Sequence, residues 1–149
     1  MKRTGWVFLL LLFTPALYAF DVTVLRSFTI SGLTRANGKL TLPLEHKQYY
    51  NIRVLNKETY DFLLSCKEPC VQLQADVTAS VVEVRCAQTR KHMWIVQVAF
   101  GRAWLVTFLV FQKGNNFSIK EPEHFTFMSK ELAEQTRHVI LQSLRQEDI

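Results

Sequence analysis

The long apolar stretch at residues 94–111 decides which folds this sequence can adopt. It is interrupted by Gln97 and by the pair Gly101-Arg102. A charge at the centre of a membrane helix costs about 2.5–3.5 kcal/mol on insertion scales. The segment is also rich in Val, Phe, Trp and Thr, which favour strands. We therefore predict two buried strands joined at Gly101, and no stable transmembrane span.

The second of these strands carries apolar residues on both of its faces. Trp104, Val106, Phe108 and Val110 alternate on one face, and Leu105, Leu109 and Phe111 lie on the other. A strand that is apolar on both faces is covered on both faces. We expect this strand to lie in the centre of a sheet.

A β-hairpin is predicted over residues 28–44, with its turn at Asn37-Gly38. This pair tolerates the positive φ angles of a type I′ turn. A two-residue turn places Arg35 opposite Leu40. Because side chains alternate between the two faces of a strand, Phe28 then lies on the face away from the other apolar side chains. A β-bulge near Gly32 would return it to their face.

Several further segments are predicted to be short strands. In one of them, residues 80–86, we expect Val82, Val84 and Cys86 to share a face. Residues 57–66 are ambiguous, since Asn56 could cap a short helix there. We favour a strand, because Tyr, Phe and Leu lie close together and Pro69 follows. The other predicted strands cover residues 49–55, 71–75, 117–119 and 125–127.

The clearest helix spans residues 129–146. Ser129 is a candidate N-cap, with Glu131 in the first turn. An apolar stripe follows helical spacing, whereas Gln135, His138, Gln142 and Arg145 fall on the opposite side. The fold class predicted is α+β: a mainly antiparallel sheet, curved or folded into two layers, with this C-terminal helix packed on it.

Residues 1–19 have the pattern of a cleaved secretory signal peptide. Lys2 and Arg3 precede an apolar run at 6–13, and Ala19 is a small residue at the expected cut. The run is far shorter than the about 20 residues of a membrane span. Removing 19 of 149 residues leaves a single domain of 130 residues, 20–149, and lowers the net charge from +5 to +3. Such a weakly positive net charge argues against a nucleic-acid partner.

Three cysteines, Cys66, Cys70 and Cys86, remain in the exported chain. In an oxidising compartment we expect one disulfide and one free thiol, and the spacing does not select the pair. The alternative is a zinc-binding module that uses the three cysteines and His92. No cofactor is predicted.

Basic residues cluster in one predicted turn: Arg85, Arg90, Lys91 and His92. Such a turn can meet an acidic partner or an anionic headgroup. No aromatic array accompanies it to stack nucleic-acid bases.

Catalytic motifs such as G-x-S-x-G and H-E-x-x-H do not occur in the sequence. An exported hydrolase-type enzyme would need a site assembled from dispersed side chains: His46, His92, His124, Asp61 and Asp76. We favour instead a small exported, periplasmic or secreted, non-catalytic protein from a bacterium. It is predicted to bind a protein partner, as an accessory or assembly factor of an envelope system. Its candidate surfaces are an exposed sheet edge and the basic turn.

Overall fold

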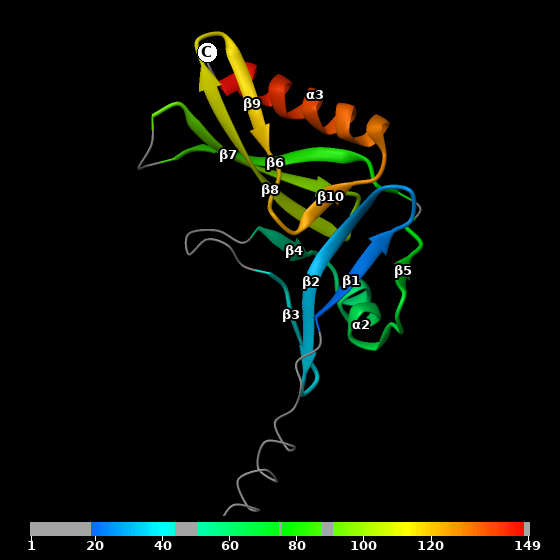
Figure 1. Cartoon of the computed structure of the whole chain (residues 1–149). Coiled ribbons are helices and arrows are strands. Elements are labelled where there is room, and N and C mark those ends of the chain that lie inside the picture. Colours follow the sequence, from blue (N-terminus) through cyan, green and yellow to red (C-terminus); the bar gives the residue numbers. More distant parts are fainter. Residues whose placement is uncertain (1–18, 44–50, 75, 88–90, 148–149) are drawn as a thin grey trace, which may run out of the picture.

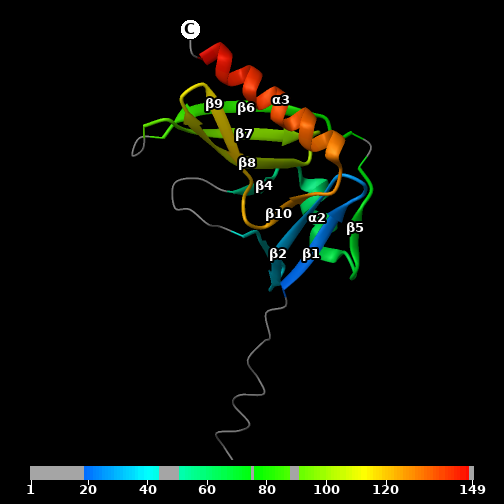
Figure 2. The same ribbon diagram turned by 45° about the horizontal axis from the view of Figure 1, so that its top comes forward.

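Two β-sheets and two helices make up the part of the chain that the structure describes, residues 19–43, 51–74, 76–87 and 91–147. The structure is a computed structural model. Both sheets are mainly antiparallel, and the C-terminal helix packs on them, as the α+β prediction requires. In both views that helix runs beside one sheet, and the other sheet lies on the far side of β8 (Figures 1 and 2).

Sheet A combines four strands from the first half of the chain with one strand from near its end. Its order is β10-β2-β1-β5, and β3 pairs with the second half of β2. Only the β1–β5 pair is parallel among these pairings. The strands are β1 (Ala19–Val24), β2 (Phe28–Ala36), β3 (Lys39–Thr41), β5 (Cys70–Gln72) and β10 (Phe125–Phe127).

Sheet B contains the two most apolar strands of the chain. Its order is β4-β8-β7-β6, and β9 pairs with the second half of β8. The strands are β4 (Ile52–Val54), β6 (Ala79–Cys86), β7 (Met93–Phe100), β8 (Trp104–Lys113) and β9 (Asn116–Lys120).

The apolar segment forms β7 and β8, as predicted, and the turn between them begins at Gly101. Its φ of 63° favours glycine, and a Cβ there would collide with the carbonyl oxygen of Asp76. Strand β8 is central, because it pairs with β7 on one side and with β4 and then β9 on the other. Trp104 and Leu105, which point to opposite faces, are both buried.

The β2–β3 hairpin confirms the predicted turn, register and bulge. Asn37 and Gly38 both have positive φ, and Arg35 pairs with Leu40. The register of β1 with β2 shifts by one residue at the bulge, where Gly32 has φ of 77°. The extra residue returns Phe28 to the buried side.

The prediction of a strand at residues 57–66 is wrong, because α2 (Lys57–Ser65) occupies them. The capping residue at the start of the helix outweighed the strand preference of the clustered aromatic residues. The N–H of Thr59 donates to Oδ1 of Asn56 at 2.8 Å, which caps the helix. The helix buries Thr59 and Leu63 on one side.

The face assigned to β6 was also wrong. The register with β7 shifts between Val81 and Glu83, so Val81 and Val84 turn toward the core. Val82 is 61% exposed. Beyond such an irregularity, each side chain points to the face opposite to the one that strict alternation predicts.

The remaining short strands lie where the sequence indicated, within a few residues of the predicted bounds. The strand predicted at 71–75 is β5, and the one predicted at 49–55 is β4. Residues 49–50 lie outside the described residues.

Helix α3 (Lys130–Glu147) confirms the C-terminal helix. The N–H of Leu132 donates to Oγ of Ser129 at 3.2 Å. The helix packs chiefly on β6, with smaller contacts to β7 and β10. Its buried stripe consists of Leu132, Thr136, Ile140 and Leu144.

Aromatic rings join the two sheets. The ring of Phe28 in β2 lies 5.2 Å from that of Phe100 in β7 and 5.1 Å from that of Phe125 in β10. Phe100 and Phe125 are in turn 5.8 Å apart. Of the helices that the structure describes, none is long and apolar enough to cross a bilayer.

Candidate functional site

Cys66 and Cys70 form a disulfide, with 5.6 Å between their Cα atoms. The third cysteine, Cys86, is an exposed free thiol on β6. The structure therefore does not bring together the three cysteines and His92 of the zinc alternative. Among the described residues, no group of three or more His, Cys, Asp or Glu side chains is placed to hold a metal ion.

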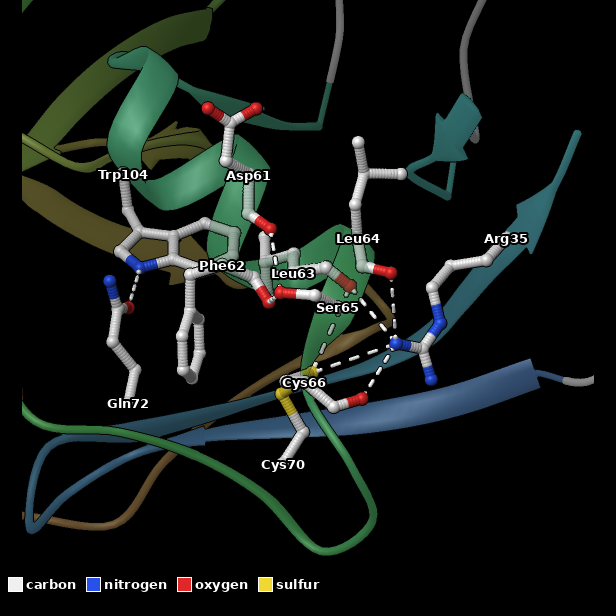
Figure 3. Close-up of a disulfide and its surroundings, with 10 residues drawn as sticks. All are labelled: Arg35, Asp61, Phe62, Leu63, Leu64, Ser65, Cys66, Cys70, Gln72 and Trp104. Carbon is white, nitrogen blue, oxygen red and sulfur yellow. Dashed lines mark hydrogen bonds between the residues drawn. A yellow bond between two sulfur atoms is a disulfide. The ribbon is translucent and has the colours of Figure 1, made fainter. Parts of the chain in front are cut away.

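Arg35 binds the end of α2 beside this disulfide (Figure 3). Its Nη1 donates to the carbonyl oxygens of Leu63, Leu64 and Cys66 at 3.3, 3.4 and 2.6 Å. The guanidinium also lies 4.2 Å from the centre of the Phe20 ring. A cation at a helix C-terminus interacts favourably with the helix dipole and satisfies its last carbonyls. We call Arg35 and the disulfide together the disulfide brace.

The disulfide brace adjoins a second set of polar contacts. Nε1 of Trp104 donates to Oε1 of Gln72 at 2.8 Å (Figure 3). Nε2 of Gln72 reaches Oγ1 of Thr59 at 3.4 Å. These bonds connect β5 to β8 and to α2. The donors and acceptors here are engaged within the fold, so the region is a structural support.

The dispersed residues considered for catalysis lie on separate elements. His92 is at the β6–β7 tip, Asp61 is on the exposed side of α2, and His46 lies outside the described residues. His124 precedes β10, where its ring packs against Gly32.

Asp76 follows β5 and has a local role. Its Oδ1 accepts the N–H of Thr78 at 2.9 Å. This hydrogen bond favours the charged form and lowers the pKa of the Asp76 carboxyl.

Cationic side chains gather at one end of sheet B. Arg85, Lys91 and His92 are exposed at the β6–β7 tip, and Arg90 of the predicted patch lies outside the described residues. The carbonyl oxygen of His92 accepts the N–H of Gln112 at 2.8 Å. The tip therefore lies directly beside the end of β8, where Lys113 is also exposed.

Helix α3 adds two arginines that the sequence did not single out for binding. Arg137 and Arg145 line a cavity of about 320 Å³ together with Leu141 and the β8–β9 turn residues Asn115 and Asn116. Arg137, Leu141 and Arg145 are four residues apart, so they share one face of the helix. The term basic end denotes Lys91, His92, Lys113, Arg137 and Arg145.

A second cavity, of about 220 Å³, adjoins the first at Arg137. Its apolar lining includes Phe108, Ile119 and Phe127, and the Phe108 and Phe127 rings stack 6.1 Å apart. Glu121 also lines it, and burial raises the pKa of this carboxyl. The two cavities together form the α3–β9 groove, which runs between that helix and that strand.

Comparison with known proteins gives no relative for this chain: no family model, no curated protein and no solved structure matches it.

Proposed function

We propose that this chain is a small exported, non-catalytic protein of the bacterial envelope, and that its basic end binds an acidic partner protein. The observation that carries the proposal is the convergence of cations from three separate segments. Lys91 comes from the β6–β7 tip, Lys113 from the end of β8, and Arg137 and Arg145 from α3.

All four of these side chains are exposed. Within the residues that the structure describes, none of the four has a carboxylate at ion-pair distance. Cations that the fold leaves uncompensated keep their charge available for an external anion. A patch of one sign raises the rate of encounter with a patch of the opposite sign and fixes its orientation.

A protein partner fits these observations better than the two alternatives. A net charge of +3 for residues 20–149 is low for a nucleic-acid binder. An enzyme would require the dispersed histidines and aspartates to converge, and those described lie on separate elements. A charged surface built from several elements of the fold is suited to recognition.

The test is capture of the partner in the native envelope with a photo-crosslinking residue at position 115, in the exposed β8–β9 turn beside Lys113. We expect one acidic protein in stoichiometric yield. The double variant Lys91→Glu/Lys113→Glu should reduce this yield at least tenfold. The matched control Lys57→Glu/Lys67→Glu reverses two exposed charges at the other end of the molecule and should leave it unchanged. Absence of a stoichiometric product, or equal loss in the control, would contradict the proposal.

Export is tested separately by N-terminal sequencing of the protein recovered from the periplasmic fraction. The expected first residue is Phe20. Recovery of the chain only in the cytosol, with Met1 or Lys2 as its first residue, would contradict export.

A further inference from the structure

Strand β9 has one backbone edge that no other strand of the described residues occupies. It pairs with β8 alone. The N–H of Gln112 donates to His92 in the opposite direction, so Gln112 does not bond to Phe117, its partner in β9. In an antiparallel pair, bonded and non-bonded positions alternate. The N–H and C=O groups of Phe117 and Ile119 therefore point away from β8.

This free edge borders the α3–β9 groove. Phe117 lines the cavity that contains Arg145, and Ile119 lines the cavity beside Ala133. The five residues of β9 extend about 17 Å at ~3.4 Å per residue. The facing part of α3, residues 133–145, extends about 18 Å at ~1.5 Å per residue. The groove has the length of one short strand.

The groove differs in chemistry along its length. Near the β8–β9 turn it presents the guanidinium groups of Arg137 and Arg145. Farther along β9 it presents the apolar lining of Phe108, Ile119 and Phe127. Its two parts can therefore recognise two different side chains of one occupant.

We propose that the α3–β9 groove binds an extended segment of the partner protein, which adds to β9 as a further strand. Main-chain hydrogen bonds to Phe117 and Ile119 hold the segment, an apolar side chain fills the 220 Å³ cavity, and a carboxylate meets Arg137 and Arg145. This inference rests on the proposed function and names the part of the partner that is bound.

The spacing along β9 sets the spacing of the recognised residues. Phe117 marks the basic cavity, and Ile119 and Glu121 mark the apolar one. Side chains on one face of a strand recur every second residue. The apolar and acidic residues of the bound segment are accordingly two or four positions apart.

The test begins with a phage-displayed library of random dodecapeptides, selected on the immobilised protein of residues 20–149. Enriched peptides should combine an apolar residue with Asp or Glu two or four positions away. A synthetic peptide of the enriched sequence is then measured by fluorescence anisotropy. A library that yields no enriched pattern, or enriched peptides without the carboxylate, would overturn the inference.

Two sets of variants, one in the peptide and one in the protein, distinguish strand addition from nonspecific binding. N-methylation of alternate amides of the peptide should lower affinity about tenfold or more in one register, and little in the other, because only every second amide faces β9. This readout leaves the fold of the protein untouched. Equal effects in both registers would overturn strand addition.

Arg137→Gln and Arg145→Gln should each lower affinity about three- to tenfold for the acidic peptide, but not for its Asn or Gln counterpart. The matched control is Lys130→Gln, an exposed cation at the other end of α3. If position 115 captures a partner while these variants bind the peptide normally, the groove assignment fails and the proposed function stands. If position 115 captures nothing, the proposed function itself fails.

Discussion

The half of the molecule built on sheet A and the half built on sheet B are stabilised by different means. Sheet A contains three strands of only three residues, and its neighbour α2 has nine residues. The disulfide brace and the Gln72 contacts support α2 and β5. Sheet B has strands of eight and ten residues whose apolar side chains bury themselves against α3 and sheet A. The short elements α2 and β5 therefore depend on covalent and polar bonds in addition to apolar burial.

The largest effect is expected where the two halves meet. Phe100→Ala removes a fully buried ring that contacts both β2 and β10, and should lower the free energy of unfolding by about 3–5 kcal/mol. Urea denaturation measures the change in the free energy of unfolding. Val82→Ala, at an exposed apolar position, serves as the control and should change stability little. A loss from Phe100→Ala no larger than that of the control would refute the role of the aromatic rings.

Removal of the disulfide should affect only the sheet A half. Cys66→Ala/Cys70→Ala opens a loop of five residues, for which chain entropy predicts a loss of about 2 kcal/mol. Amide hydrogen exchange should rise in α2 and β5 and stay constant in β7 and β8. Cys86→Ser is the matched control, because that thiol is free and exposed. Faster exchange throughout sheet B would show that the halves are not supported independently.

Arg35→Met keeps most of the side chain's length and removes its donors. Three carbonyl groups at the end of α2 lose a charged partner, and we expect a loss of about 1.5 kcal/mol. Thermal unfolding followed by circular dichroism measures it. Arg26→Met, at an exposed turn position, is the comparison variant, and an equal loss there would remove the special role assigned to Arg35.

The smallest effect is expected at Asp76, between the two halves. Its pKa is lowered by the hydrogen bond from Thr78, so its contribution to stability is present above the ordinary pKa of an aspartate. That contribution is lost as pH falls through the lower folded value. Wild type and Asp76→Asn should therefore differ in Tm at neutral pH and converge in acid. A difference that persists unchanged at low pH would contradict this assignment.

The sequence predicted the local features whose cause lies within a few residues. The Asn37-Gly38 turn, the bulge at Gly32 and the amphipathic α3 all follow from backbone freedom or spacing. The α2 segment was misjudged, because a single cap at Asn56 competed with aromatic residues that also suit strands. In β6, the register shifts by one residue, and nothing in the alternation of apolar and polar residues predicts such a shift.

The sequence did not predict which distant segments of the chain pair with each other. Nothing local indicates that β5 joins β1 in parallel, or that β10 completes sheet A. The basic turn was found from clustered residues, whereas Arg137 and Arg145 follow the pattern of an ordinary solvated helix face. Their importance emerges only when the β8–β9 turn is placed opposite them. A binding surface assembled from separate segments carries no single motif.

The pairing of β2 with β10 also limits how the chain can fold as it is synthesised. The β2–β3 hairpin is complete once residue 41 has emerged, but the first part of the same edge of β2, residues 28–30, meets its partner only at Phe125–Phe127. Until then an apolar strand edge is available to neighbouring chains. Nearly the whole polypeptide must be released before this edge is closed, so a chain cut short before β10 should aggregate even though its hairpin can form.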